Sequence, residues 1–237
     1  MSTDINSIGW LQGLYEVCST AKHRVGTFRL TADGRGYRYA KAGAALTAGY
    51  ATVAAQAAAV HVDEACPAVA VGVSQITLTV SAGTAIAEDQ LAGGFLAIHD
   101  GGVQYLIDSN TAITSSGTSI IVTLDEAVRV ALTTSNEFSL FANPWWEVTS
   151  SATDENLCTG VCPVVVADDL YFWSQTKGCA TALIKGTPAV GSNLIYSPSG
   201  AIAVIAGSVA VDVPIVGTMF GSVGVEDDFG CVFLQID

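Results

Sequence analysis

Short runs of apolar or alternating residues, separated by Gly, Pro or Asp-Gly, recur along this chain and constrain its fold more than any other feature. In residues 73–80, for example, Ile76, Leu78 and Val80 alternate with polar residues at a period of two. That period places successive side chains on opposite faces of a strand. The apolar residues are mostly Ala and Val, with few Leu and two Met, a mixture that favours strands over long helices. We therefore expect an all-β protein.

Residues 1–49 are expected to form an N-terminal arm followed by a basic hairpin. The arm has a loose helical stripe of apolar residues, but Gly9 and Gly13 interrupt it, and each costs roughly 1 kcal/mol relative to Ala in a helix. A short helix or an arm that becomes ordered on contact is therefore expected. Asp33-Gly34 separates two strand-like runs, which is typical of a hairpin. The period of two predicts that this hairpin has one apolar and one basic face.

Two small β-barrel or β-sandwich domains are expected to follow, over residues 50–146 and 147–237. Asn143-Pro144 and the polar residues after it indicate a boundary between them. The strands expected in the first domain are residues 73–80, 94–98, 103–107, 119–124 and 128–132. Those expected in the second domain are residues 161–167, 170–175, 180–184, 201–205, 209–213 and 230–236.

The basic residues are concentrated near the N-terminus of an acidic chain. Six of the nine Lys and Arg residues lie between positions 22 and 41, while the net charge is −13. A charge distribution of this kind suits a protein that docks by one end, and a nucleic-acid binder would spread a basic face over its folded body. The uncharged stretches 42–60 and 186–211 are too poor in large apolar residues, or too broken by Gly and Pro, to span a membrane. We expect neither a nucleic-acid nor a membrane partner.

The residues that usually carry chemistry form no recognisable catalytic motif, so we expect no enzymatic activity, metal or cofactor. His61-Val-Asp-Glu64 and His99-Asp100 are expected to be surface turns. Asp168-Asp169 and residues 226–228 could bind Ca²⁺ but lack the alternating spacing of a dedicated loop. The six cysteines are scattered and expected to be reduced thiols, and a zinc site at Cys158 and Cys162 would need two more distant ligands.

Two groups of aromatic residues leave a carbohydrate-binding site open as an alternative. Trp145-Trp146 and residues 171–173 could form a platform on which sugars stack. Adjacent residues of a strand face opposite ways, so each cluster is expected mainly to fill the core and an interface.

Residues 25–43 carry a Gly-Thr strand, an Asp-Gly-Arg turn, an aromatic-Arg-Tyr strand and a Lys-Ala-Gly exit. This order resembles a signature near the N-terminus of structural proteins from the head modules of tailed bacteriophages. Further similar segments are residues 92–96, 105–111, 120–134, 143–144, 172–178 and 186–192. The chain departs from the pattern at Gly36, where a longer polar residue is usual, and in its six cysteines.

The resemblance implies a virion structural protein without enzymatic activity, a decoration (cement) protein that binds the outside of a phage capsid and stabilises it. Its partner would be the major capsid protein, and it would assemble on the capsid exterior in the host cytoplasm. The alternative is a receptor-binding or carbohydrate-binding module of a phage tail or surface. The high apolar content also predicts a homo-oligomer, a trimer rather than a dimer.

Two groups of residues are the expected contacts. Those expected to touch the capsid through the basic hairpin are Arg29, Arg35, Arg38 and Lys41. Those expected to be buried by the arm against the capsid or a neighbouring subunit are Ile8, Trp10, Leu11, Leu14 and Tyr15.

Overall fold

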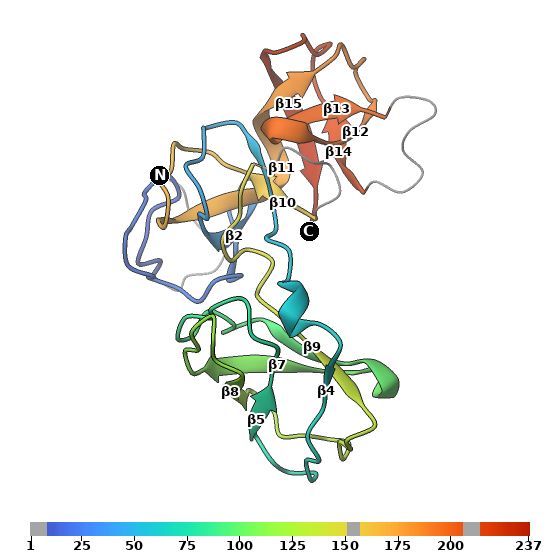
Figure 1. The fold of residues 1–237 in the computed structure, drawn as a ribbon. Helices are drawn as coiled ribbons and strands as arrows, with labels where there is room; N and C mark the ends of the chain where they lie inside the picture. The colour runs from blue at the N-terminus through green and yellow to red at the C-terminus, as the bar shows by residue number, and fades with distance from the viewer. Residues whose placement is uncertain (1–8, 151–156, 206–213) are drawn as a thin grey trace. The chain divides into compact units, whose positions relative to one another are not determined.

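The chain is all-β, as the alternating runs predict (Figure 1). The structure, a computed structural model, describes residues 9–150, 157–205 and 214–237, and these contain no α-helix. Three single-turn 3₁₀ helices accompany the strands: η1 (Ala59–His61), η2 (His99–Gly101) and η3 (Pro198–Gly200). The chain folds as two compact units, unit 1 from Met1–Ala55 with Pro144–Asp237 and unit 2 from Gln56–Asn143. This division differs from three consecutive segments, because the N-terminal hairpin shares a sheet with the C-terminal strands.

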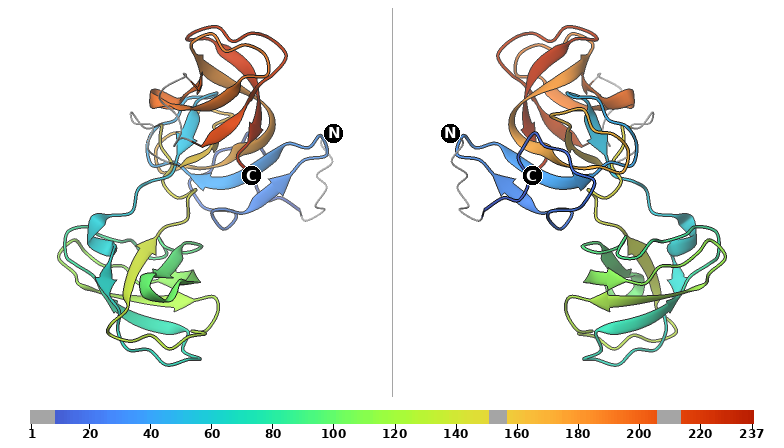
Figure 2. Two further views of the ribbon diagram at one scale, coloured as in Figure 1. Left: turned by 90° about the vertical axis from the view of Figure 1, so that its right-hand side faces the viewer. Right: turned by 90° about the vertical axis from the view of Figure 1, so that its left-hand side faces the viewer.

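Unit 1 is a five-stranded β-barrel with extra strands at one end (Figure 2). The barrel strands are β11 (Tyr171–Lys185), β13 (Ala201–Val204), β12 (Asn193–Ser197), β14 (Ile215–Met219) and β15 (Phe229–Gln235). The extra strands are β1 (Phe28–Leu30), β2 (Gly36–Lys41), β3 (Ala51–Val53) and β10 (Cys158–Val161). The barrel closes because β15 pairs antiparallel with β11. The expected strand at residues 209–213 lies outside the described residues.

Strand β11 joins the barrel to the extra strands. The sequence predicts two strands here, whereas the structure has one strand of 15 residues. Its first half pairs with β2, and from Lys177 onward it pairs with β15. An irregularity between Gln175 and Lys177 marks the change of partner. The buried Gln175 amide spans this irregularity, because its Nε2 donates to the carbonyl oxygens of Lys177 at 3.2 Å and Cys179 at 2.9 Å.

The barrel interior is filled by apolar side chains of moderate size. Its buried members from the barrel strands are Ala180, Ala182, Ile184, Leu194, Tyr196, Ile202, Val216, Met219, Val232 and Leu234. The strands approach very closely at Gly217, where an added Cβ would lie 2.4 Å from the carbonyl oxygen of Phe233. Glycine is therefore required there by the close approach of two backbones.

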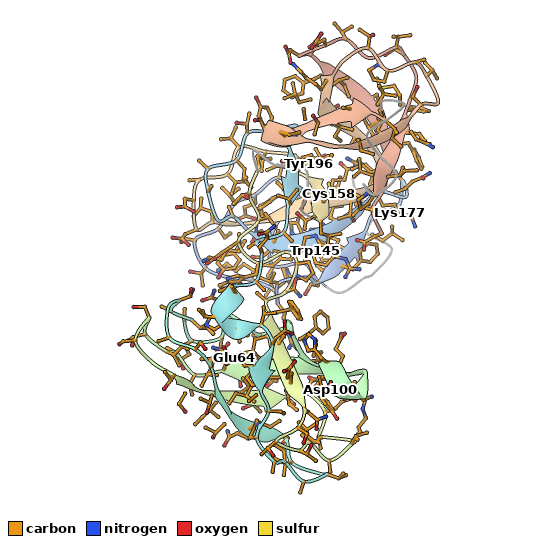
Figure 3. The ribbon with its side chains drawn as sticks, turned by 45° about the vertical axis from the view of Figure 1, so that its right-hand side comes forward. Glu64, Asp100, Trp145, Cys158, Lys177 and Tyr196 are labelled. Atoms are coloured by element: carbon orange, nitrogen blue, oxygen red, sulfur yellow. The ribbon has the colours of Figure 1, made fainter. Side chains whose placement is uncertain are left out.

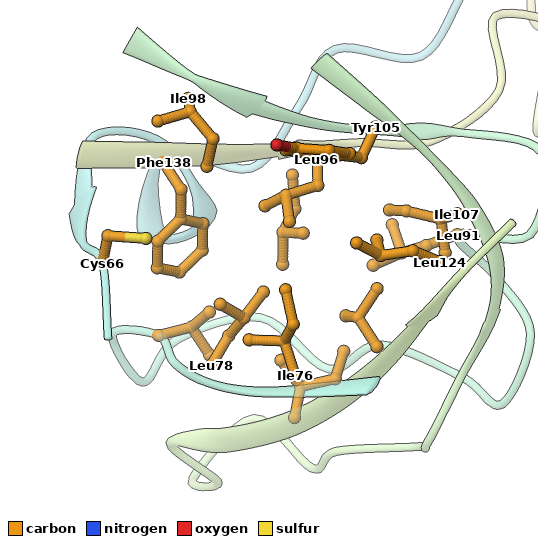
Figure 4. Packing of buried hydrophobic residues seen from close by; sticks show 14 of the residues in the cluster. Cys66, Ile76, Leu78, Leu91, Leu96, Ile98, Tyr105, Ile107, Leu124 and Phe138 are labelled. Atoms are coloured by element: carbon orange, nitrogen blue, oxygen red, sulfur yellow. The ribbon is translucent and has the colours of Figure 1, made fainter. Parts of the chain in front are cut away.

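Unit 2 is a curled six-stranded half-barrel. Its strands are β4 (Glu64–Ala65), β5 (Gln75–Thr79), β6 (Phe95–Ile98), β7 (Val103–Asn110), β8 (Ser119–Leu124) and β9 (Glu137–Phe141), in the sheet order β4-β9-β6-β7-β8-β5. A hairpin turn around residues 100–102 joins β6 and β7. Side chains from opposite sides of the curled sheet converge on one core, in which Leu78, Leu96, Ile107 and Phe138 are fully buried (Figure 4).

The strand expected at residues 128–132 does not form. Leu132 forms an isolated bridge with Val69, and Val128 bonds the backbone of Gly72 and Val73, but no continuous ladder results. Between Val128 and Leu132 the ladder is interrupted, because the hydroxyl oxygen of Tyr105 accepts from the backbone N–H groups of Arg129 at 3.2 Å and Val130 at 3.3 Å. These amides are bonded by a side chain, so the apolar run is not in a ladder.

The N-terminal segment, defined here as residues 9–23, packs onto β2 and β11 rather than standing free. Its central residue is Gln12, only 1% exposed. The Nε2 of Gln12 donates to the carbonyl oxygens of Glu16 at 2.8 Å and Tyr171 at 3.0 Å, and its Oε1 accepts from the Tyr39 hydroxyl at 2.6 Å. Of the two expected states, a short helix or an arm that becomes ordered on contact, the helix does not form in residues 9–23, and Gln12 bonds this segment to the sheet within the chain itself.

Aromatic rings pack together beneath the N-terminal segment. Trp10, His23 and Tyr39 surround Trp173, with ring centroids 5.0–5.3 Å from its own. Tyr39 and Trp173 are fully buried, and burial raises the pKa of Tyr39 to about 12. We call these four residues the aromatic cluster. Two of its rings come from the N-terminal segment, so that segment is part of the core of unit 1.

We expect the substitution Gln12→Ala to destabilise unit 1 by about 1–3 kcal/mol, because the buried Tyr39 hydroxyl loses the oxygen that accepts its proton and the Tyr171 carbonyl keeps only the Cys18 N–H as a donor. Urea unfolding followed by tryptophan fluorescence measures this, since all four Trp lie in unit 1. The neighbouring Leu11→Ala is the matched control, because Leu11 is 72% exposed and its removal should change stability little. Equal effects of the two substitutions would contradict this account of the segment.

Acidification is expected to destabilise unit 1 through His23. Burial and the charge of Arg29 lower the pKa of His23 below 6.5, so the unfolded chain takes up this proton at a higher pH than the folded chain does. The contribution to stability is complete above pH 6.5 and is lost as the pH falls toward the lower folded pKa. The urea midpoint reported by tryptophan fluorescence should therefore fall over this window. In His23→Phe, which keeps an aromatic ring, this fall should be reduced; an unchanged pH profile would contradict the assignment.

Candidate interaction surface

The hairpin at the centre of the expected contact does not have one apolar and one basic face. Its register pairs Arg29 with Tyr37, and Phe28 with Arg38. Directly paired residues share a face of the sheet, so each face carries one arginine and at least one aromatic ring. The prediction of two contrasting faces was therefore wrong. Alternation within each strand is as expected, but it does not fix the register across the Asp33-Gly34 turn.

Arg29 lies inside unit 1 and is only 6% exposed. Its guanidinium carbon is 4.9 Å from the ring centroid of Trp10 and 5.4 Å from that of Trp173. Its Nη1 also donates to the backbone oxygen of Gln12 at 3.0 Å. Arg29 thus holds the N-terminal segment against the aromatic cluster. The sequence predicts Arg29 as a capsid contact, but its side chain is buried in unit 1.

Arg38 lies on the other face, between two rings. Its guanidinium carbon is 4.9 Å from the centroids of both Phe28 and Trp145. Its Nε and Nη2 donate to the two carboxylate oxygens of Asp237 at 2.9 Å and 3.1 Å. A bidentate pair of this kind fixes the guanidinium in one orientation. The end of the chain is thereby tied to the hairpin.

Lys41 is paired with two carboxylates. Its Nζ is 2.8 Å from Asp169 and 3.4 Å from Glu147, and it lies 4.6 Å from the ring centroid of Trp146. Burial by itself would lower the pKa of Lys41, but the hydrogen bonds and charges of the two carboxylates outweigh it and raise the pKa. The positive charges of Arg38 and Lys41 are therefore already compensated within unit 1.

Arg35 lies in the hairpin turn and connects it to the N-terminal segment. Its Nε is 2.8 Å from Asp33, and its Nη1 donates to the hydroxyl oxygen of Tyr15 at 3.1 Å. A hydrogen bond from Thr31, together with Arg35, lowers the pKa of Asp33. The Arg35 side chain remains 29% exposed, so it still presents part of its charge to solvent.

Two side chains of the N-terminal segment point outward while two point inward. Leu14 is buried and Trp10 packs in the aromatic cluster, whereas Leu11 is 72% and Tyr15 59% exposed. The expected contact residues of the arm are therefore divided by the fold. Leu11 and Tyr15 remain available to a partner, and Ile8 lies outside the described residues.

A hollow of about 400 Å³ opens beside Tyr15 on unit 1. Its lining residues are Tyr15, Arg35, Ala48, Gly49, Pro163, Gln175, Thr181 and Phe229. Tyr15 and Phe229 give this hollow two partly exposed rings, Arg35 gives it a positive charge, and Gln175 gives it a buried amide. Together with Leu11, it forms what we call the N-terminal edge, the surface of unit 1 made by Leu11, Tyr15, Arg35 and the hollow.

The aromatic pairs do not form an open stacking platform. Phe172 and Trp173 are fully buried. The Trp145 ring, labelled in Figure 3, has Arg38 over it, and its Nε1 donates to the carbonyl oxygen of Thr159 at 2.8 Å. Trp146 is covered by Lys41. Tyr171 stacks on Tyr39 with ring centroids 5.9 Å apart, so the rings that the sequence offers for sugar stacking are packed in the core, covered by a cation or stacked on another ring.

The other candidate ligand residues have local partners. His99 contacts Ser139 through Nε2 at 2.7 Å and Asp63 through Nδ1 at 3.2 Å. Glu226 and Asp227 pair with the Lys185 ammonium at 3.2 Å and 3.0 Å. Within the described ranges, no group of three or more His, Cys, Asp or Glu side chains is placed to hold a metal ion. The same ranges contain no helix long and apolar enough to cross a membrane.

One exposed apolar surface was not identified from the sequence. Phe229 and Phe233 point outward from β15 and are 49% and 42% exposed, and Phe220 lies 6.5 Å from Phe233 between ring centroids and is 51% exposed. We call these three residues the phenylalanine face. Residues 229–234 contain no polar side chain in either phase of the alternation, so the pattern cannot distinguish the side that faces solvent.

Comparison with protein-family models, with curated proteins and with solved structures gave no match to this chain.

Proposed function

We propose that this chain is a virion structural protein, a decoration protein that binds the outside of a phage capsid and stabilises it. The observation that carries the proposal is the N-terminal edge. Leu11 and Tyr15 are large, exposed side chains on a segment that Gln12 anchors to the sheet. A binding segment that is ordered before contact loses less conformational entropy when its partner arrives. The resemblance of residues 25–43 to phage head proteins supports the capsid as that partner.

Apolar contact is proposed to supply most of the affinity. Full burial of a large apolar side chain contributes about 1.5–3 kcal/mol. Arg38 and Lys41 have carboxylate partners in unit 1. These two residues are therefore proposed to contribute less to electrostatic attraction toward an acidic capsid surface. Arg35 is proposed to be the main electrostatic contact, because it lies in the N-terminal edge beside Tyr15.

Self-association is proposed through the phenylalanine face. Three exposed rings on neighbouring elements form an apolar patch, and such patches on soluble proteins mark interaction sites. The phenylalanine face continues into the hollow through Phe229. A homo-oligomer, and a trimer rather than a dimer, would cover these rings before or during binding to the capsid.

We expect the double substitution Leu11→Ser with Tyr15→Ser to weaken binding to the capsid at least tenfold, because two exposed apolar contacts are removed. Cosedimentation with empty shells of the cognate major capsid protein measures the affinity. The matched control is Val71→Ser with Val130→Ser in unit 2, where both residues are more than half exposed. Equal affinities for the two double variants, or no binding of the unaltered chain to shells, would contradict the proposal.

Light scattering after size exclusion is expected to give a mass near three times 24.3 kDa at micromolar concentration. Phe229→Ser with Phe233→Ser should shift the mass toward that of one chain, because these substitutions remove apolar rings from the phenylalanine face. The Val71→Ser and Val130→Ser variant again serves as the control and should keep the larger mass. A single-chain mass for the unaltered protein would contradict self-association in solution.

A further inference from the structure

Two cysteines meet on the outer side of the barrel, where β11 and β15 close it. Residue pairing places Cys179 beside Phe233 and Thr181 beside Cys231, so the two cysteines are diagonal neighbours on one face of the sheet. Their Sγ atoms are 2.7 Å apart. Cys179 is exposed and Cys231 is half-buried, so a small reagent can reach this pair from solvent.

The separation of these sulfur atoms is shorter than an ordinary packing contact. Nonbonded heavy atoms pack at about 3.5–4.0 Å, whereas the sulfur atoms of a disulfide lie about 2.03–2.05 Å apart. The Cys179 and Cys231 thiols therefore need to move by less than about 1 Å to reach bonding distance. Both are held at fixed positions by the ladder between β11 and β15.

The remaining cysteines lack this combination of proximity and access. Cys66, Cys158 and Cys162 are buried. Burial raises the pKa of Cys158 and of Cys162 to about 12, and burial with the neighbouring Cys179 raises the pKa of Cys231 to about 11, so proximity and access, rather than ease of thiolate formation, distinguish the pair. Cys18 is half-buried, and its Sγ contacts the carboxylate of Glu16 at 3.7 Å, which together with burial raises its pKa.

We propose that Cys179 and Cys231 are a reversible oxidation site, which forms a disulfide across the closing strands of the barrel by exchange with a low-molecular-weight disulfide such as oxidised glutathione. The thiolate of Cys179 attacks one glutathione sulfur, forms a mixed disulfide and releases one glutathione thiolate. The thiolate of Cys231 then attacks the Cys179 sulfur and releases the second glutathione. Two cysteine thiols are oxidised, one glutathione disulfide is reduced, and the two thiol protons end on the two glutathione molecules.

This bond would join strands that are distant in the sequence and adjacent in the barrel. Cys179 and Cys231 are separated by 52 positions, and closing a loop of this length restricts the unfolded chain. The oxidised protein should therefore melt on the order of 10 °C higher than the reduced protein. The site does not depend on the proposed capsid role.

The test is to incubate the full, folded chain with oxidised glutathione, unfold it in urea that contains N-ethylmaleimide so that the remaining thiols are blocked, digest without reduction and identify the peptides by mass spectrometry. The expected product links the peptide of Cys179 to the peptide of Cys231 within one chain, with the other four cysteines blocked. Dithiothreitol should reverse the link and the rise in melting temperature. Blocked Cys179 and Cys231, a persistent glutathione adduct on Cys179, or a link between two chains would each overturn the proposal.

Variants separate the two steps of the exchange. In Cys231→Ser the reaction should stop at the mixed disulfide on Cys179, detected as a glutathione adduct on that peptide. Cys18→Ser is the matched control, because Cys18 is also half-buried but lies outside the pair, and it should leave the linked product unchanged. Formation of the same yield of adduct on Cys179 in the unaltered chain as in Cys231→Ser would overturn the second step.

Discussion

The hydrogen bonding of β11 is the constraint on which the rest of unit 1 depends. This one strand pairs with β2, β10, β13 and β15, so the N-terminal hairpin and the barrel are built on the same backbone. A regular strand with side chains alternating between two faces has one sheet neighbour on each side. Strand β11 exceeds that limit because the irregularity at Gln175 and Lys177 changes its partner along its length, and the Gln175 amide bonds the carbonyl groups there. Through β2, the same strand supports the N-terminal segment and thus the surface we assign to binding.

Two arginine side chains of unit 1 pack against aromatic rings. Arg29 and Arg38 both lie over aromatic rings, one inside the aromatic cluster and the other between Phe28 and Trp145. Guanidinium groups suit these positions because they are planar and weakly hydrated. A cluster of basic residues in the sequence therefore corresponds to several separate environments in the fold. What remains for a partner is a surface with more apolar character than the charge pattern indicates.

The sequence predicts the fold class and several of the strands, because Gly and Asp-Gly turns and the period of two are local signals. The sequence does not predict strand pairing at positions where residues distant in the sequence determine it. Nothing local indicates that Tyr105 bonds the amides of Arg129 and Val130, or that β11 continues through Gln175. For the same reason the sequence predicts only in part which candidate contact residues are exposed. Leu11 and Trp10 are adjacent and both apolar, and only the packing around Trp173 determines that one points outward and the other inward.

The order of the strands has a consequence for synthesis of the chain on the ribosome. Residues 56–143 form unit 2 and emerge between β3 and β10, which pair with each other in unit 1. Unit 2 thus has all its strands before β11 exists. At roughly 5–20 residues per second, β2 must wait on the order of ten seconds for its partner. During that interval Trp173 has not yet been synthesised. The rings of Tyr37 and Tyr39, which are fully buried in the finished sheet, therefore lack it as a packing partner. The nascent hairpin therefore exposes apolar rings during synthesis, at a stage when unit 2 already has all of its strands.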